Sequence, residues 1–432
     1  MRAQKLPTTK ENLKSLRPRL VVIGNGMAAM RTVEELLHLE LDLYDITVIG
    51  REPHGNYNRI MLSPVLSGEK SFLEIMLHTP EWYVARGIKL VSGVVAESVH
   101  RKRREVTLSN GEVVGYERLL IATGSNPFVI PMPGHQHPAV IQFRDIQDVE
   151  KMVEIAASKA GQRAIVLGGG LLGLEAANGL AKRGVKVTVV HDIDYLLNRQ
   201  LDREAANMLQ AELERRGIEF VIGVKSDHIV IDEAGILKGL AFKDGDMLEG
   251  DMLVMAVGVR PNVALAKSIG LQVDKAIITD DTMQTSDPRV YAVGECVQHR
   301  GALFGLVAPL FDQAKVCASH LAEHGIRRYV QKATATTLKV TGVNLYSAGD
   351  FSGDGSESLV LRDPSQSVYK KLFLKNNKLI GAVLYGDIQD GVAYFDLIQR
   401  GVDVAAQRNT LIFSPDTLTK SSPKPKGVSH VI

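Results

Sequence analysis

The chain has only two cysteines, Cys296 and Cys317, in 432 residues. Two thiols are too few for an iron–sulfur cluster or a disulfide framework, and these two are not spaced as a CxxC couple. We therefore expect both to be buried apolar residues rather than redox centres.

The sequence also lacks a long apolar segment. No run approaches the roughly 18 residues needed to span a bilayer, and the first nineteen residues are polar and basic, without the apolar core of a signal peptide. We expect a cytoplasmic protein that does not bind membranes, with a flexible leader at residues 1–18.

There is little excess charge. The formal net charge is +2, with 45% hydrophobic and 23% charged residues, a balance that gives no overall field to attract nucleic acid. His54 and His299 flank motif residues but lack the spacing of metal ligands, so we expect no metal site. The length is enough for about two to four domains.

What the sequence does contain is a glycine-rich turn after an apolar strand. In RLVVIGNGMAAM, which begins at Arg19, the residues Gly24, Gly26 and Ala29 match the GxGxxG/A pattern of dinucleotide-binding units. The first glycine allows the tight turn, the second lets backbone approach a pyrophosphate, and the third small residue lets the helix lie close to the strand. The free N–H groups of that helix then bind phosphate. By itself the pattern also fits an ordinary strand–turn–helix unit.

A second copy of the pattern favours the nucleotide interpretation. At Ala164 the chain reads AIVLGGGLLGLEAANGLAKRGVKVTVV, in which Gly168, Gly170 and Gly173 lie between an apolar strand and an amphipathic helix. A short turn then leads to a second strand at 185–190, as in a βαβ unit. Two such units predict two bound dinucleotides.

Further strands indicate how the chain connects these units. The strand at 119–122 ends in the small residues Ala122, Thr123 and Gly124, and the strand in DPRVYAVGECV rejoins the same sheet. A third block begins near residue 333 and includes KKLFLKNNKLIGAVLYGD, a predicted hairpin. We predict an α/β fold with two Rossmann-like domains, the second inserted into the first, and a small α+β C-terminal domain.

Seven motifs in order, GNGMAA, YNRIMLS, ATG, GGGLLGLE, GVRPN, YAVGEC and GLVAPL, cover nearly the whole chain after the leader. Together they resemble the two-dinucleotide flavoprotein oxidoreductases of the rubredoxin reductase and ferredoxin reductase type. The resemblance is closest to the N-terminal flavoprotein half of assimilatory NAD(P)H nitrite reductases and to the electron-transfer subunit of assimilatory nitrate reductase. It implies FAD on the first unit, NAD(P)H on the second, and a C-terminal domain near the flavin face. The implied bounds are 19–126 and 259–330 for the FAD domain, 144–258 for the NAD(P)H domain, 331–420 for the C-terminal domain and 421–432 for a disordered tail.

The resemblance also implies the FAD contacts. The adenosine ribose falls to Glu52, because Arg51 occupies the position where the family usually has an acid. Arg59 is implied near the flavin and its phosphates, with a solvated loop arginine as the alternative. Lys339 is implied to place positive charge near the reduced flavin, with a surface lysine as the equal alternative. The remaining implied contacts are Gly24, Gly26 and Ala29 at the pyrophosphate, Ala122, Thr123 and Gly124 after the next strand, and Gly294 and Glu295 at the ribityl hydroxyls.

For NAD(P)H, the resemblance places Glu175 near the nicotinamide as the candidate catalytic residue, and a helix-surface glutamate is the alternative. His191 stands where an NADH enzyme often has an acid that repels a 2′-phosphate, while Asp192 beside it offers a ribose contact. The choice between NADH and NADPH stays open. The other implied contacts are Gly168, Gly170 and Gly173 at the pyrophosphate, and Gly258 of GVRPN.

The implied activity is electron transfer from NAD(P)H through FAD to a separate acceptor protein. That acceptor is a nitrate or nitrite reductase catalytic subunit, or an iron–sulfur carrier. Thiol-dependent relatives have a redox cysteine in the segment that corresponds to 57–68, which contains none here. The alternatives are a rubredoxin or ferredoxin reductase and, in another class, a non-catalytic nucleotide-sensing subunit. The run HRKRRE at 100–105 is either a docking patch for an acidic carrier or, more often, a solvated hairpin.

Overall fold

The protein is described by a computed structural model that covers residues 17–158, 162–332, 335–340, 342–413 and 415. The predicted tail, and the predicted leader apart from Arg17 and Pro18, lie outside these residues. The chain forms two compact units, each assembled from separate segments. The first unit comprises 1–128, 144–149 and 258–332, and the second comprises 129–143, 150–257 and 333–432.

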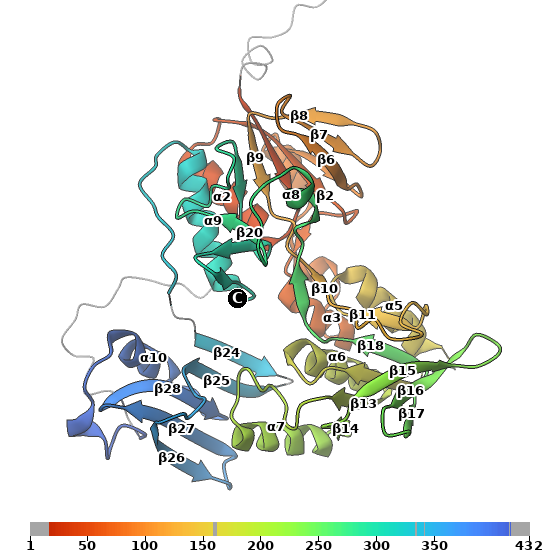
Figure 1. Ribbon diagram of the computed structural model, residues 1–432, viewed down its shortest axis with the longest axis vertical. Helices are drawn as coiled ribbons and strands as arrows, with labels where there is room; N and C mark the ends of the chain where they lie inside the picture. Colours follow the sequence, from red (N-terminus) through yellow and green to blue (C-terminus); the bar gives the residue numbers. More distant parts are fainter. Residues whose placement is uncertain (1–16, 159–161, 333–334, 341, 414, 416–432) are drawn as a thin grey trace, which may run out of the picture. The chain divides into compact units, whose positions relative to one another are not determined.

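The first unit is built on a five-stranded parallel sheet in the order β21-β9-β1-β2-β5. Figure 1 labels its strands β9 and β2. The central strand of the sheet alternates its side chains between two cores, as a strand buried on both faces must. Leu20 and Val22 pack with helices α2 and α9, whereas Val21 and Ile23 pack with the antiparallel sheet β6-β7-β8. The bounds are β1 Arg19–Ile23, α2 Met27–Leu39, β2 Asp45–Gly50, β5 Lys89–Ser92, β6 Ala96–His100, β7 Glu105–Leu108, β8 Val113–Gly115, β9 Arg118–Ile121, β21 Val290–Ala292 and α9 Val307–Leu321.

Shorter elements of the first unit surround the ends of this sheet. The run HRKRRE forms the turn between β6 and β7, as the solvated-hairpin interpretation predicts. The remaining bounds are β3 Asn56–Tyr57, η1 Arg59–Met61, α3 Leu62–Ser67, η2 Leu73–Ile75, β4 Met76–His78, α4 Pro80–Ala85, β10 Ser125–Pro127, β19 Val259–Pro261, α8 Ala264–Ser268, β20 Ile277–Thr279, β22 Val297–His299 and β23 Ala302–Leu303.

The second unit repeats the same plan with a parallel sheet in the order β11-β18-β12-β13-β14. In both units the first βαβ crossover joins neighbouring central strands through one helix, which is α2 in the first unit and α6 in the second. The bounds are β11 Val140–Gln142, α5 Ile146–Ala157, β12 Arg163–Leu167, α6 Leu171–Lys182, β13 Lys186–His191, α7 Arg203–Arg215, β14 Glu219–Ile222, β15 Ser226–Ile231, β16 Leu237–Phe242, β17 Met247–Glu249 and β18 Met252–Met255.

The C-terminal part of the second unit is an antiparallel sheet in the order β24-β25-β28-β27-β26, with helix α10 packed on its apolar face. Asn376 and Asn377 both have positive φ, of 52° and 57°, which is the geometry of a two-residue hairpin turn, so the predicted hairpin is confirmed. The predicted fold class is likewise confirmed. The bounds are β24 Ala335–Val340, β25 Val343–Gly349, β26 Glu357–Asp363, β27 Val368–Lys375, β28 Lys378–Tyr385, α10 Gly391–Arg400 and η3 Ala405–Gln407.

Candidate functional site

The phosphate turn of the first unit requires glycine at position 24 and leaves open space beside position 26. Gly24 has φ +111°, and a Cβ there would lie 2.2 Å from the carbonyl oxygen of Ala122. Gly26 is the N-cap of α2, where no described side chain caps the helix and a Cβ would meet no described atom within 4 Å. Ala29 is fully buried, so the helix lies close to the sheet. The first N–H groups of α2 therefore face open space at the end of β1, which fits a bound pyrophosphate.

The second unit has a turn with the same construction. The N–H of Gly168 donates to the carbonyl of Val190 at 2.8 Å, just as that of Gly24 donates to Ile49 at 2.9 Å. Gly168 has φ +123°, and a Cβ there would lie 2.4 Å from the Ala256 carbonyl oxygen. Gly170, the N-cap of α6, would again meet no described atom within 4 Å.

The third small residue differs between the two turns. A Cβ on Gly173 would lie 1.8 Å from the Gly168 carbonyl oxygen, whereas the first turn has room for the side chain of Ala29. Helix α6 therefore approaches its turn more closely than its counterpart does. In each unit the three residues predicted at the pyrophosphate lie together in one turn between a strand and a helix.

Asn25, the middle residue of the first turn, is held by side chains that the sequence did not single out. Its side-chain oxygen accepts a 2.6 Å hydrogen bond from the Tyr83 hydroxyl, and its carbonyl accepts one of 2.8 Å from the Asn56 amide. The His78 ring lies 3.2 Å from the Asn56 side-chain oxygen and 2.8 Å from Glu34. This network fixes the turn from outside the βαβ unit.

Glu52 and Arg59, predicted at different parts of FAD, form one ion pair. Arg59 Nη2 lies 2.6 Å from Glu52 Oε1, and the Tyr57 hydroxyl donates to Glu52 Oε2 at 2.8 Å. Burial disfavours the Glu52 carboxylate, but the charge of Arg59 and the hydrogen bonds from Tyr57 and Arg59 outweigh it, so the pKa of Glu52 is lowered. Arg59 is therefore a half-buried, paired residue rather than a free solvated one, and its contact with FAD stays a prediction.

The pair continues to the second FAD motif through Arg144, which the sequence analysis missed. Arg59 Nη1 donates to the Arg144 carbonyl at 2.7 Å, and Arg144 Nη2 lies 2.5 Å from Glu295 Oε2. The Ser125 hydroxyl donates to the same Glu295 oxygen at 2.6 Å. The only signal was a basic residue at the start of the RDIQDVE segment, which resembles many helix starts.

The ATG segment and Gly294 meet beside the start of α2. Gly294 has φ +96°, and a Cβ there would lie 3.2 Å from the Ala28 Cβ. The Thr123 hydroxyl donates to the Asn262 carbonyl at 2.7 Å, and Gly124 has φ +64°. Together with Ala122 beneath Gly24, these predicted residues surround one end of the parallel sheet.

His191 ends β13 close to the second phosphate turn. A Cβ on Gly169 would lie 2.8 Å from the His191 ring, so the middle glycine of the GGG run is required by this packing, and its role was missed. Burial lowers the pKa of His191, which makes the ring neutral at physiological pH. Asp192, whose side chain is 72% exposed, lies 3.5 Å from the His191 ring. Of these two residues, only Asp192 carries a carboxylate.

The remaining predicted residues are dispersed. Glu175 lies in the first half of α6 and is half-buried. Gly258 has φ +108° and follows Ala256 by two residues, and the carbonyl of Ala256 packs against Gly168 of the second phosphate turn. Lys339 lies on β24, and its side chain is outside the described part of the structure.

Neither cysteine has the character of a redox thiol. Cys296 and Cys317 are both buried, and burial raises the pKa of each thiol. A protonated, inaccessible thiol is a poor nucleophile. The prediction of buried apolar cysteines is confirmed.

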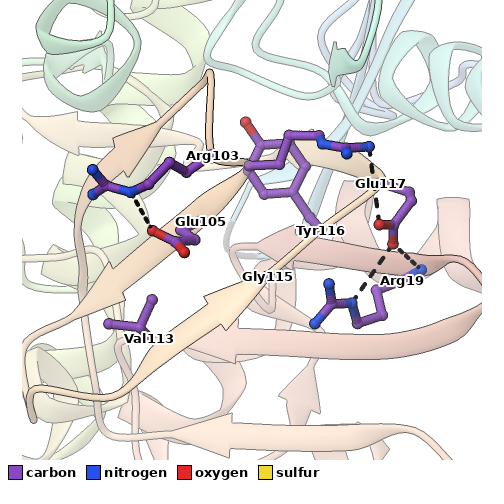
Figure 2. A pocket seen from close by; sticks show the side chains of 8 residues that line it. Arg19, Arg103, Glu105, Val113, Gly115, Tyr116 and Glu117 are labelled. Atoms are coloured by element: carbon purple, nitrogen blue, oxygen red, sulfur yellow. Dashed lines mark hydrogen bonds and ion pairs between the residues drawn. The ribbon is translucent and has the colours of Figure 1, made fainter. Parts of the chain in front are cut away.

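A separate cavity of about 270 Å³ is lined by residues that include Arg19, Gly115 and Glu117. Figure 2 shows these residues. Arg19 begins β1 and Glu117 precedes β9, and the N–H of Arg19 donates to the Glu117 carboxylate at 2.8 Å. Ligands of parallel α/β sheets bind at the carboxyl ends of the strands. This cavity is therefore not the cofactor seat.

The comparisons with known proteins agree with this geometry. A family model described as pyridine nucleotide-disulphide oxidoreductase matches residues 18–334. The chain belongs to this family. A second model, described as the rubredoxin NAD+ reductase C-terminal domain, matches residues 335–402. Flavoproteins of this family use FAD and NAD(P)H, as the two glycine turns predict.

Two curated relatives come from Bacillus subtilis (strain 168). The chain is 43% identical to a nitrite reductase [NAD(P)H] over 398 residues, which are 92% of this chain and 49% of that protein. It is 40% identical to an assimilatory nitrate reductase electron transfer subunit over 400 residues, 92% of this chain and 51% of that protein. The chain thus spans about half the length of these relatives.

A solved structure confirms the architecture. NADH:rubredoxin oxidoreductase from Clostridium acetobutylicum is 26% identical, with a TM-score of 0.76 and coverage of 90% of this chain and 97% of that one. Among the described residues, no helix is both long and apolar enough to cross a bilayer.

Proposed function

We propose that this chain is the flavoprotein reductase of an assimilatory nitrite or nitrate reductase system and passes electrons from NAD(P)H to a separate redox protein. The observation that carries the proposal is that the two glycine turns share the same geometry. In each turn the N–H of the first glycine donates to a carbonyl of the neighbouring strand. The names of the two Bacillus subtilis relatives support the assignment to nitrogen assimilation.

When bound, NAD(P)H would supply a hydride to FAD, and the reduced flavin would release its electrons one or two at a time. In the proposal, α2 and α6 direct their free N–H groups at the two pyrophosphates. Glu52 accepts hydrogen bonds from the adenosine ribose, and Glu295 does so from the ribityl chain. Glu175 lies near the nicotinamide and orients it.

Domain roles follow from the same proposal. The FAD domain comprises 19–126 and 259–330, the NAD(P)H domain 144–258, and the C-terminal domain 331–420. Gly258 and Lys339 are proposed as further contacts, the latter by virtue of its charge. We place the protein in the cytoplasm, where NAD(P)H is available.

The acceptor centre must lie outside this sequence. Cys296 and Cys317 are the only thiols, and a [4Fe–4S] cluster usually requires four. We therefore propose that electrons leave for an iron–sulfur, molybdenum or siroheme centre on a nitrate or nitrite reductase catalytic subunit or an iron–sulfur carrier.

A rubredoxin reductase is the second candidate. The match of residues 335–402 to the rubredoxin NAD+ reductase C-terminal domain favours it, as does the similarity to the clostridial structure. A ferredoxin reductase belongs to the same alternative, since it differs only in the carrier.

The test is an anaerobic titration of the FAD-loaded protein with NADH and with NADPH, followed by the flavin absorbance near 450 nm. Bleaching by either coenzyme supports the proposal, and a flavin that stays oxidised with both removes it and favours a nucleotide-sensing role. Electron delivery is then compared between a nitrite reductase catalytic subunit and rubredoxin. Turnover with rubredoxin alone would select the second candidate.

A further inference from the structure

The loop that follows His191 is attached to the C-terminal sheet by the carboxylate of Asp202. This loop, residues 192–202, is here called the ribose loop because it follows the second strand of the NAD(P)H unit, and it ends at Asp202, the N-cap of α7. Asp202 Oδ1 accepts the N–H of Ala205 at 3.1 Å. Its other oxygen, Oδ2, accepts a 2.6 Å hydrogen bond from the Tyr369 hydroxyl and lies 3.3 Å from Lys371 Nζ.

These contacts are well shielded from water. Tyr369 is fully buried, and the Asp202 side chain is only 12% exposed. Arg362 on the neighbouring strand β26 pairs with Glu204 in the first turn of α7 through both of its carboxylate oxygens. The charged hydrogen bond to Asp202 has low exposure and is among the stronger polar contacts in proteins, whereas the Arg362–Glu204 pair, with side chains 57% and 39% exposed, contributes less. The first turn of α7 is therefore attached to strands β26 and β27.

The ribose loop connects this attachment to the second phosphate turn. The N–H of Leu201, next to Asp202, donates to the Leu197 carbonyl at 2.9 Å, and the N–H of Leu197 donates to the Gly169 carbonyl at 3.0 Å. Leu197 has φ +49°, a left-handed conformation that is strained for leucine and persists only when its surroundings enforce it. Fixing Asp202 at one end supplies that constraint.

We propose that the C-terminal domain holds the ribose loop in the conformation that receives the adenosine ribose of NAD(P)H, with Tyr369 as the positioning residue. The inference rests on the proposed seat of NAD(P)H in the second unit and assigns a task to the C-terminal domain. Tyr369 acts through Asp202 and Leu197, not by touching the coenzyme. Loss of its hydroxyl releases the loop and weakens coenzyme binding while FAD stays in place.

The experiment compares Tyr369→Phe with the unmodified FAD-loaded protein. We expect the dissociation constant for the oxidised coenzyme, NAD+ or NADP+, to rise roughly three- to tenfold in calorimetric titration. Amide hydrogen exchange at Leu197 and Leu201 should become faster. The FAD content and the rate of flavin reduction at saturating coenzyme should not change.

Tyr385→Phe is the matched control. The Tyr385 hydroxyl lies on the same sheet and donates to the Met208 carbonyl of α7 at 3.4 Å, and among the described residues it forms no hydrogen bond with Asp202. We expect it to leave the coenzyme affinity and the loop exchange unchanged. Lys371→Met, which removes the second partner of Asp202, should weaken binding in the same direction as Tyr369→Phe.

The inference is overturned if Tyr369→Phe and Lys371→Met bind the coenzyme as the unmodified protein does. It is equally overturned if Tyr385→Phe weakens binding as much as they do. Failure of the unmodified protein to bind either coenzyme would instead refute the proposed function, so the two failures are distinguishable.

Discussion

The guanidinium of Arg59 lies 2.6 Å from the carboxylate of Glu52. The Tyr57 hydroxyl donates a hydrogen bond to the second carboxylate oxygen of Glu52. The Arg59 guanidinium also lies 5.0 Å from the centre of the Tyr57 ring. Both charges of this cluster are compensated within the first unit. Removing one partner therefore leaves a partly buried charge without compensation, which costs more than removing both.

We predict that Arg59→Met lowers the free energy of unfolding of the first unit by about 2–3 kcal/mol. The double variant Glu52→Gln/Arg59→Met should recover part of this loss because no charge is stranded. Urea denaturation of both variants, with FAD release followed in parallel, measures the difference. Arg103→Met, whose side chain is 64% exposed, is the control, and a similar loss there would contradict the prediction.

The Glu52 pair also makes stability depend on pH on the acid side. The pKa of Glu52 is lower in the folded protein, mainly through Arg59 and Tyr57 acting against burial, than the ordinary glutamate value. Its stabilising contribution is therefore complete above about pH 4.5 and is lost as the pH falls through the lower folded value. We expect the stability difference between the unmodified protein and Glu52→Gln to shrink in denaturation curves between pH 6 and pH 3. A constant difference over that range would refute this coupling.

Gly170→Ala separates coenzyme binding from folding. A Cβ at Gly170 meets no described atom, so the variant should fold, but the methyl group enters the space assigned to the pyrophosphate. We expect at least about a tenfold weaker NAD(P)+ affinity, with the FAD content intact. Gly305→Ala is the control, since a Cβ there is also free of described atoms and lies in the first unit.

Gly26→Ala is the corresponding change in the first unit and should produce the reverse pattern. The FAD content should fall, while NAD(P)+ binding by the second unit persists. Absorbance at 450 nm and calorimetry measure the two quantities. A loss of both ligands in either variant would indicate unfolding rather than a blocked seat.

The cysteines provide a test of the electron route. Cys296→Ala and Cys317→Ala should each retain dye reduction by NAD(P)H within about twofold, because both thiols are buried and protonated. Stopped-flow reduction of the flavin is the measurement. Loss of activity in a variant with normal FAD content and melting temperature would reveal a thiol relay.

The sequence predicted what depends on short-range spacing. The two glycine turns, their βαβ units and the hairpin at Asn376 and Asn377 are local patterns, in which a strand, a turn and the next element are adjacent in the chain. Each requires backbone geometry that few residues other than glycine or asparagine tolerate. Such requirements are visible in a single sequence.

Long-range partners were not predictable in the same way. Arg144 meets Glu295 across 151 positions, and Tyr83 meets Asn25 across 58. No local periodicity encodes which arginine or tyrosine the folded chain brings to a motif. Tyr369 and Asp202 are a further example, 167 positions apart, and their contact appears only once the C-terminal sheet is folded.

The cavity beside Arg19 has a practical use because it lies at the opposite end of the first parallel sheet from the glycine turn of the first unit. The five-residue strand β1 separates this edge from Gly24, a span of about 16 Å at roughly 3.3 Å per residue. A tether placed at the exposed Arg103 would therefore lie away from the turn proposed to bind FAD. The first unit can thus be anchored to an electrode or bead through the end of its sheet that is opposite the proposed FAD turn.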